Sequence, residues 1–407
     1  MHRVPRVAVS MWLLTIAFVP IWLGVGLPLY FYPASLVGIL VLVAILPLKV
    51  GLVGPADLMI GMFFIACLAP VIGGGATITT VFVATTQWIV AFLVGRLLSS
   101  KVSFEWIYSC VGLVFSAVAT LALIEFFSGW NPFVGLGPVT TLHLDWASLQ
   151  GRGGLVRAEG AFGHSIALGS SLALAIPLTM ASSFRPPIRI LMSVLMLCAV
   201  AVTLSRVSML DAALAMVLAV GLVGRGISRA ARIGGIFALL VVTVSIAPFV
   251  SSVLATAGEE ATRSAGYRSS LTDLIPFISP LGFSSVASRT SSGELYFGRF
   301  QSIDSQLILI GLTYGWAALV CAIVLLAVAV TVVLRRHASP GTVAIVAQIP
   351  ALVTVALITQ YSMFFWFVVG LAAAGQMRSS VRVPTEAGGE GEQDGEANPI
   401  GSARRVA

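Results

Sequence analysis

The chain has 407 residues, of which 58% are hydrophobic and only 10% are charged, and its formal net charge is +7. Its mean hydropathy of +1.02 leaves too little polar surface for a water-soluble fold, so the composition excludes a soluble domain. The basic residues are spread between apolar runs instead of being gathered on one soluble segment, and we therefore expect no nucleic-acid partner.

Apolar runs of membrane-spanning length follow one another along the chain. A helix needs about 20 apolar residues to cross a bilayer, and the alternating pattern of a membrane β-barrel does not occur. The sequence therefore predicts an all-α, polytopic transmembrane bundle of about 12 spans. We expect these spans at residues 8–28, 34–50, 57–73, 77–98, 105–127, 162–183, 187–204, 208–224, 233–254, 305–334, 341–359 and 361–377. The first run lacks a convincing cleavage site after it, so we interpret it as an uncleaved helix.

The positions of lysine and arginine predict how the bundle is oriented, because cytoplasmic loops are enriched in both. With the N-terminus in the cytoplasm, 16 of the 23 Lys and Arg residues fall in cytoplasmic connections or tails, and both termini are cytoplasmic. The membrane domain then covers residues 1–383, with long extracytoplasmic loops at 128–160 and 255–304. Residues 384–407 are acidic and rich in glycine, and we expect them to form a disordered cytoplasmic tail.

The first polar cluster along the chain that matters for chemistry lies at the entrance to the predicted span at residues 162–183. Arg157 and Glu159 precede this span and His164 enters it, while three nearby glycines allow close approach of backbones. Two interpretations of His164 remain open: a hydrogen-bonded residue at the membrane interface, or a catalytic base.

Arg206 lies in a turn of a few residues between two predicted spans, on the side where short loops lack positive charge. A charge held within a helical bundle costs about 2.5 to 3.5 kcal/mol on insertion, so it is usually paired and functional. One interpretation is an ion pair with Asp211 that fixes the turn. The other is that Arg206 faces an outward cavity and binds an anion.

The loop at residues 255–304 carries arginines, acids and tyrosines between two apolar segments. Apolar and aromatic residues recur in it at spacings of four, three and four: Tyr267, Leu271, Leu274 and Ile278. This spacing predicts an amphipathic helix over residues 259–275 that lies on the outer membrane face and is ended by Pro276. Arg263 and Arg268 would then stand at headgroup height, where guanidinium groups suit phosphate oxygens. Alternatively, these arginines only extend toward lipid headgroups.

Asp304 lies where the long loop re-enters the membrane. Aspartate in this position before an apolar run is typical of a helix N-cap. Partial burial would also raise the pKa of the Asp304 carboxyl toward the range that is useful for a general base.

The cysteines all lie inside apolar runs, without metal-ligand spacing, at Cys67, Cys110, Cys198 and Cys321. No acidic cluster typical of a metal site occurs in the sequence either. We therefore expect no disulfide, no metal and no cofactor.

The order of these polar points resembles the O-antigen ligase and polymerase family of bacterial membrane proteins. An Arg-x-x-Gly-x-Phe-Gly-His segment starts at Arg157, a Ser-Arg turn contains Arg206, a Tyr-Arg pair at Arg268 precedes a Pro-Leu-Gly at 280–282, and Ser-Ile-Asp at Asp304 opens a span. The resemblance covers residues 157–316. It implies a membrane-embedded, metal-independent glycosyltransferase in the bacterial cytoplasmic membrane, with a polyprenyl-diphosphate-linked glycan as donor and a glycan or other hydroxyl as acceptor.

The same resemblance assigns roles to residues. It implies that Arg206 and Arg268 hold the diphosphate, and we add Arg157 and Arg263 as candidates for the same role. In ligases a histidine opens the span after the long loop and activates the acceptor hydroxyl, whereas this chain has Asp304 there. Asp304, Glu159 and His164 are therefore the candidates for proton removal.

This chain departs from the family pattern at further positions: Ser165 and Ile166 replace a common Pro-Asn, Ser284 replaces a glycine, and Thr313 replaces a glutamate. These differences favour a polymerase of oligosaccharide repeat units, in O-antigen, capsule or exopolysaccharide assembly, over an O-antigen-type ligase. A polytopic lipid or glycan transporter is the alternative from another class, because many spans with both termini inside are typical of carriers.

Overall fold

The computed structural model describes residues 3–27, 29–46, 53–223, 233, 266–267, 269–290 and 295–381. Within these ranges the chain is mostly helical, which confirms the predicted helical class. The predicted span at 233–254, apart from Ile233, and the tail at 384–407 lie outside the described residues, as do Arg263 and Arg268.

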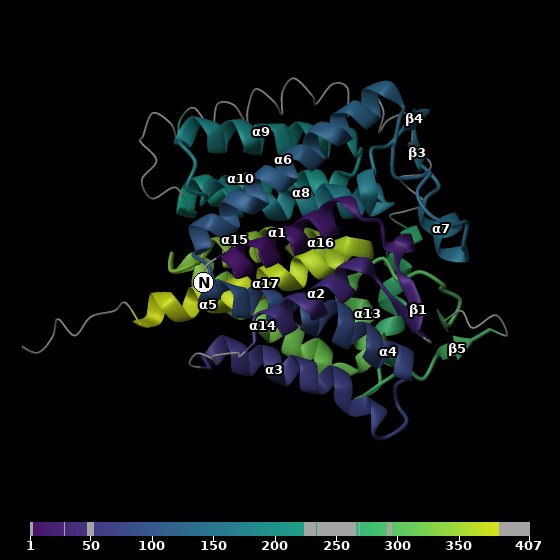
Figure 1. Ribbon diagram of the computed structural model, residues 1–407. Coiled ribbons are helices and arrows are strands. Elements are labelled where there is room, and N and C mark those ends of the chain that lie inside the picture. Colours follow the sequence, from purple (N-terminus) through teal and green to yellow (C-terminus); the bar gives the residue numbers. More distant parts are fainter. Residues whose placement is uncertain are drawn as a thin grey trace, which may run out of the picture.

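Long helices run side by side and form the body of the molecule (Figure 1). The α-helices up to residue 218 are α1 (Arg3–Phe18), α2 (Pro33–Ala44), α3 (Pro55–Leu68), α4 (Ile78–Val83), α5 (Val90–Lys101), α6 (Phe104–Ser128), α7 (Thr141–Trp146), α8 (Ser165–Met180), α9 (Pro186–Val202) and α10 (Arg206–Leu218). Those after residue 300 are α13 (Gln306–Tyr314), α14 (Trp316–Leu334), α15 (Pro340–Ala347), α16 (Ile349–Thr354) and α17 (Thr359–Val381).

Short elements complete the described chain. The 3₁₀ turns are η1 (Ile21–Leu23), η2 (Ala69–Val71), η4 (Gly160–Phe162) and η6 (Thr272–Phe277), and the π-helical turns are η3 (Ala84–Ile89) and η5 (Ala219–Val223). Antiparallel two-stranded sheets pair β1 (Val25–Leu27) with β2 (Leu29–Phe31), β3 (Gly151–Arg152) with β4 (Leu155–Val156), and β5 (Ala287–Arg289) with β6 (Leu295–Phe297).

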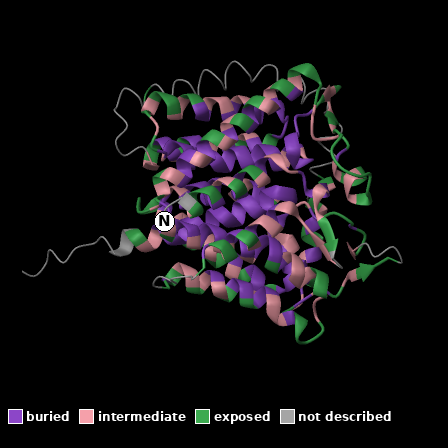
Figure 2. Ribbon diagram, viewed as in Figure 1, coloured by how far each residue is buried: buried purple, intermediate pink, exposed green. Residues whose placement is uncertain are grey.

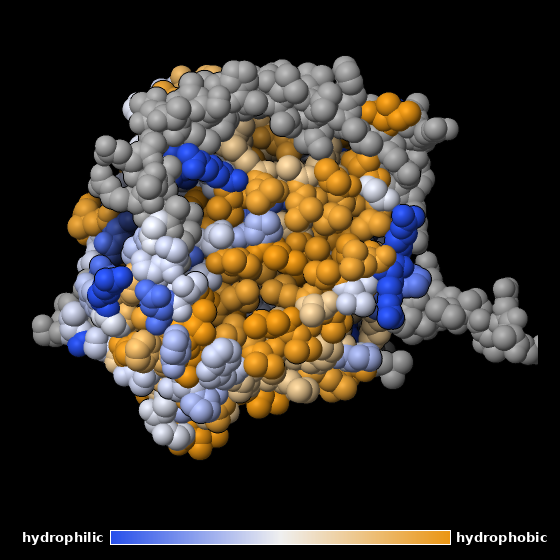
Figure 3. All heavy atoms as spheres, turned by 180° about the vertical axis from the view of Figure 1, so that it is seen from behind, coloured by the Kyte–Doolittle hydropathy of each residue, from blue (hydrophilic) through white to orange (hydrophobic). Residues whose placement is uncertain are grey.

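Among the described residues, four helical segments are long and apolar enough to cross a membrane: Ile78–Lys101, Phe104–Ser128, Arg206–Val223 and Trp316–Leu334. Six further apolar helices are shorter, and they include α2, α8 and α9. Apolar side chains cover the middle of the face seen in Figure 3, and polar groups lie toward its two ends. This distribution is typical of a protein surrounded by a bilayer.

The connections between helices gather at two opposite ends of the bundle. Labels β1, β3, β4, β5 and α7 lie together at one end, which we call the loop end, and the N-terminus lies toward the other (Figure 1). Hydrogen bonds join distant segments at the loop end: Trp22 Nε1 donates to the Leu136 carbonyl (3.0 Å), and the Phe283 N–H donates to the Gly75 carbonyl (2.8 Å). At the opposite end, Arg96 pairs with Asp57 (2.7 Å). Connections predicted to share a side of the membrane therefore lie together.

Two predicted spans are interrupted. The run at 305–334 divides into α13 and α14 at Gly315, whose φ of +91° favours glycine. The freed Trp316 N–H donates to the Ser279 carbonyl (2.9 Å), so the neighbouring loop satisfies the break. The run at 341–359 divides at Gln348 because Pro350 lacks an N–H and crowds the preceding turn.

The start and the loop of the chain also differ from the sequence expectation. The predicted span at 8–28 is helical only to Phe18 and continues into η1 and β1. In the loop, Pro276 does not end the helix, because the tighter turn η6 contains it and continues to Phe277. Leu271, Leu274 and Ile278 form a buried stripe as predicted, but this stripe packs into the protein core.

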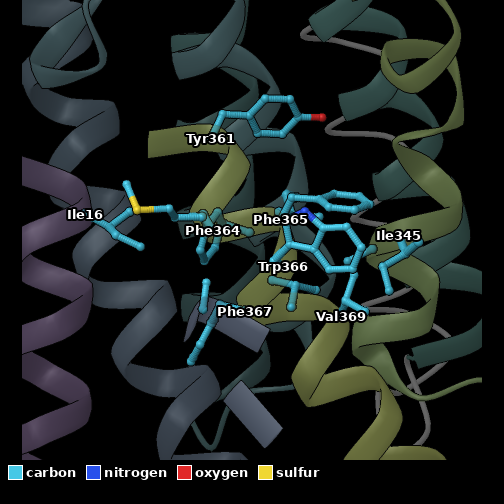
Figure 4. Close-up of a cluster of buried hydrophobic side chains, with 14 of the residues drawn as sticks. Ile16, Ile345, Tyr361, Phe364, Phe365, Trp366, Phe367 and Val369 are labelled. Atoms are coloured by element: carbon cyan, nitrogen blue, oxygen red, sulfur yellow. The ribbon is translucent and has the colours of Figure 1, made fainter. Parts of the chain in front are cut away.

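Helices α8 and α17 form the centre of the molecule and carry much of its buried surface (Figure 2). Figure 4 shows that α17 uses both faces: Phe364 and Phe367 point toward α1 and α6, whereas Trp366 and Val369 point toward Ile345. The Phe364 ring stacks on Phe115 with centroids 4.4 Å apart.

Helix α17 lies directly against α5 because glycines stand at their contact. A methyl group on Gly370 would overlap the Phe92 carbonyl oxygen of α5, and one on Gly95 would overlap the Phe367 carbonyl oxygen of α17. Close backbone approach through small residues is a main source of helix association in membranes.

We expect Gly370→Ala to lower the melting temperature, because two backbones must separate to admit the methyl group, at a cost of about 1 to 3 kcal/mol. Gly61→Ala on α3 is the matched control: an added methyl group there meets nothing within 4 Å. Its higher helix propensity should leave stability unchanged or raise it by about 0.5 to 1 kcal/mol. Thermal unfolding of the detergent-solubilised protein, followed by tryptophan fluorescence, measures both. Equal melting temperatures for the two variants would contradict the packing.

Candidate active site

The turn between α9 and α10 is short and strained. Leu204 has a φ of +50° although it is not glycine, which marks a conformation that its surroundings impose. Ser205 then caps α10 by accepting the Ser208 N–H (3.2 Å). Arg206 is the first residue of α10, and its side chain is exposed.

Two arginines hold this turn: Arg152 at the end of β3, and Arg157 directly after β4. Arg157 Nε donates to the Thr203 carbonyl (2.8 Å), and Arg152 Nη1 donates to the Leu204 carbonyl (2.9 Å). The last carbonyls of a helix lack partners within it and lie at the negative end of its dipole, so cations stabilise them. Arg157 is only 6% exposed. These contacts make Arg157 a residue that positions the turn carrying Arg206.

Glu125, in the last turn of α6, fixes the segment that follows the hairpin. Its carboxylate accepts the Gly160 N–H (2.8 Å), the Glu159 N–H (3.1 Å) and Asn131 Nδ2 (2.8 Å). The side chain is buried, so these donors compensate for lost hydration. A carboxylate on a helix thereby orders the backbone on which Glu159 lies.

Glu159 itself is 1% exposed and accepts the Gln150 N–H (3.0 Å). Burial raises the pKa of the Glu159 carboxyl to about 7, and the charge of Glu125 adds to this effect. The Gln150 N–H and the charge of Arg157 act in the opposite direction. Glu159 therefore changes its protonation near neutral pH.

His164 caps α8, as Nδ1 accepts the Ile166 N–H (3.2 Å). Because the cap uses Nδ1 as an acceptor, the ring proton lies on Nε2, which can then donate a hydrogen bond but not accept a proton. The structure favours the interfacial interpretation of His164.

Asp304 does not cap α13, because Ser305 occupies the N-cap and accepts the Ile308 N–H (3.3 Å). The Asp304 carboxylate instead accepts the Ser302 hydroxyl (3.2 Å) and is partly exposed. The Tyr267 hydroxyl donates to the Ser302 carbonyl, and its ring packs edge-on against Phe300. The Asp304 carboxylate therefore does not cap a helix, and it is partly exposed to solvent.

Residues 355–360 join these two groups of polar side chains. At one end, Gln306 donates its N–H to the Val355 carbonyl (3.0 Å) and accepts the Leu357 N–H through Oε1 (2.7 Å). At the other end, Gln360 Nε2 donates to the Ala161 carbonyl (2.8 Å). The start of α13, next to Asp304, is thus linked to the segment that carries Glu159 and His164.

The predicted Arg206–Asp211 pair does not form in the described structure. The Asp211 carboxylate is fully buried and accepts the Ser170 hydroxyl (3.2 Å) and the Ala351 N–H (3.2 Å). Residues five apart point about 140° away from each other around a helix. Arg206 therefore faces outward while Asp211 faces the bundle core.

Glu125, Gln150 and Gln360 were not identified by sequence reasoning, although they organise this region. Glu125 could have been found in the sequence, because it is an acid inside an apolar run, and ionisable residues within membrane spans usually have a function. Within the described ranges, no three His, Cys, Asp or Glu residues gather as in a metal site. The absence of a metal remains a prediction.

No protein-family model matches the sequence, and a search of curated proteins finds no match.

Glu159 should make stability depend on pH. Below its ordinary pKa of 4.5 the stability that it contributes is fully present, and this contribution is lost as pH rises to about 7, because the folded state keeps the proton longer. Glu159→Gln preserves the acceptor for the Gln150 N–H but cannot ionise. We expect the melting temperature of this variant, relative to the natural protein, to rise from pH 5 to pH 8. A difference that is constant over this range would contradict the assignment.

Proposed function

We propose that this protein is a membrane-embedded glycosyltransferase that polymerises polyprenyl-diphosphate-linked oligosaccharide repeat units. It works without a metal, in O-antigen, capsule or exopolysaccharide assembly. The loop end faces the outer side of the bacterial cytoplasmic membrane, about 12 spans cross the bilayer, and both termini lie in the cytoplasm.

The observation that carries this proposal is the arginine-held turn at residues 203–205. Arg152 and Arg157 bind its carbonyls, which ties Arg206 to the segment that bears Glu159 and His164. Bridging residues 355–360 connect the same segment to the start of α13 beside Asp304. Polar residues that are distant in the sequence thus lie together at one end of the bundle. A donor that is anionic and anchored in the membrane requires a site at such an end.

The chemistry follows from the charges of these groups. The acceptor hydroxyl oxygen forms a bond to the anomeric carbon of the donor sugar, the bond from that carbon to the diphosphate oxygen breaks, and the diphosphate leaves with its electron pair. Guanidinium groups of Arg206 and Arg268 stabilise the growing negative charge. The hydroxyl proton passes to a carboxylate.

Asp304 is the best placed of the three candidate bases. Glu159 is almost completely buried, and the cap that His164 forms leaves its ring proton on Nε2. Asp304 is partly exposed at the loop end and has a tyrosine hydroxyl nearby. In this assignment Glu159 and His164 shape the site, while Arg157 holds the turn.

A lipid or glycan carrier is the second candidate, and one observation favours it. Helix pairs α13–α14 and α15–α16 are discontinuous, and the buried Asp211 carboxylate binds the first turn of α16. Broken helices with buried polar groups are typical of transporters. An O-antigen-type ligase would use the same site with another acceptor.

One experiment separates these functions. The purified protein in detergent is given polyprenyl-diphosphate oligosaccharide, and the products are separated by size. Longer glycans together with released polyprenyl diphosphate support the polymerase. Transfer only to an added lipid or protein acceptor supports the ligase, and movement across vesicle membranes without bond cleavage supports the carrier.

Within that assay, we expect Arg206→Ala and Arg268→Ala each to abolish chain extension while expression and melting temperature stay unchanged. Arg206→Lys should restore little activity, because an ammonium lacks the planar fork that matches phosphate oxygens. Arg299→Ala is the matched control: this loop arginine packs on the Phe300 ring and lies outside the proposed clamp. Retained activity in both alanine variants would remove the diphosphate clamp from the proposal.

A further inference from the structure

A long apolar cavity lies between α3, α13, α14, α15, α16 and α17. Its volume is about 140 Å³, and apolar side chains line almost all of it. Figure 4 shows Trp366, Val369 and Ile345, which line the cavity, gathered on one side of α17. The Trp366 ring stacks on Phe63 with centroids 5.4 Å apart, which gives the cavity an aromatic wall.

The cavity is elongated along the helices. On α14 its lining runs from Ala322 to Val332, which corresponds to about 15 Å of helix. Polar groups occur in the lining only near its two ends: Gln306 lies at the loop end, and Thr342 and Gln376 lie at the opposite end. An apolar molecule lying parallel to the helices fits this shape better than a compact polar one.

The loop end of the cavity lies close to the candidate active site along the chain. Gln306 lines the cavity, and it is also the residue whose Oε1 holds residue 357 in the bridging segment. Asp304 lies two residues before it. A molecule with an apolar chain in this cavity would therefore have its polar end at the loop end, beside Asp304.

The other side of the cavity is formed by α14, the helix that is most open to lipid among the candidate spans. Its side chains are almost all apolar, yet only 17% of its most apolar stretch is buried within the protein. Val328 lines the cavity although its side chain is 42% exposed. A chain can therefore enter sideways from the bilayer, and the remainder of a long chain can stay in the lipid.

We propose that this cavity binds the first isoprene units of the polyprenyl chain of the donor, and so sets the depth at which the diphosphate enters the site. The inference rests on the proposed function for the identity of the chain. It adds the helix past which the donor enters, α14 at Val328, and a set of residues that recognises the lipid instead of the sugar.

The test uses the full-length protein in phosphatidylglycerol nanodiscs and a polyprenyl diphosphate with a diazirine in an isoprene unit near the diphosphate. After irradiation, mass spectrometry locates the labelled residues. We expect the label on cavity-lining residues of α3, α14 and α17, and we expect unlabelled polyprenyl diphosphate to remove it.

Val328→Trp narrows the opening and should reduce labelling at least about tenfold, which corresponds to about 1.4 kcal/mol of binding. Val324→Trp is the matched control, because Val324 lies one turn away on the same helix and is 44% exposed but does not line the cavity. It should label as the natural protein does. Both sites are exposed, so neither substitution disturbs the core.

Three results would overturn the inference: label outside the cavity, unchanged labelling of Val328→Trp, or a diazirine-bearing phosphatidylglycerol that labels the cavity and is not displaced by polyprenyl diphosphate. Labelling requires no sugar transfer, so the two proposals fail separately. A protein that labels as expected but extends no glycan loses the proposed reaction and keeps the lipid site. A protein that extends glycans but is labelled outside the cavity keeps the proposed reaction and loses the lipid site.

Discussion

The arrangement of the loop end depends on two guanidinium groups bound to the carbonyls that end α9. Arg157 and Arg152 reach Thr203 and Leu204 from a hairpin about fifty residues earlier. The Arg157 contact satisfies the carbonyl of the α9 C-cap, at the negative end of the helix dipole, and the Arg152 contact satisfies the next carbonyl in the turn. Without them, Leu204 would lose contacts that support its left-handed conformation. Arginine has this role here because its planar fork can bind separate acceptors at once.

The acidic side chains of this region differ in how deeply they are buried, and this difference gives them different roles. Glu125 is buried in α6 and gives its oxygens to backbone and amide donors, so it orders the chain. Glu159 is also buried, and this burial, with a smaller effect from the charge of Glu125, raises the pKa of its carboxyl to about 7. Asp304 is partly exposed and accepts only a serine hydroxyl among its described contacts. Among these three acids, Asp304 is therefore the one that we propose as the base.

Composition and hydropathy were sufficient to predict a mostly helical chain with helices long and apolar enough to cross a membrane, and the turn before Arg206 lies where it was predicted. Helix interruptions were missed because the apolar pattern continues through Gly315 and Gln348, where tertiary contacts satisfy the freed backbone groups. Asp304 was considered as a cap, yet the following serine takes that position. The role of Arg157 in holding a diphosphate stays a prediction. Its contacts with Thr203 and Gln150 were not predicted, because they depend on a hairpin that two-residue strands do not reveal in sequence. The sequence showed where the charged residues lie along the chain, but it did not show which groups they bind.

The most direct test of the account is the distance between positions 206 and 268 in the folded protein. Arg206→Cys and Arg268→Cys are combined in one chain, and a short bifunctional maleimide is added to membranes. The account predicts a cross-link that polyprenyl diphosphate suppresses, whereas Arg206→Cys combined with His337→Cys, from the opposite end of the bundle, should give none. Absence of the first cross-link, or its formation only after the cytoplasmic side is opened, would contradict a shared diphosphate site at the loop end.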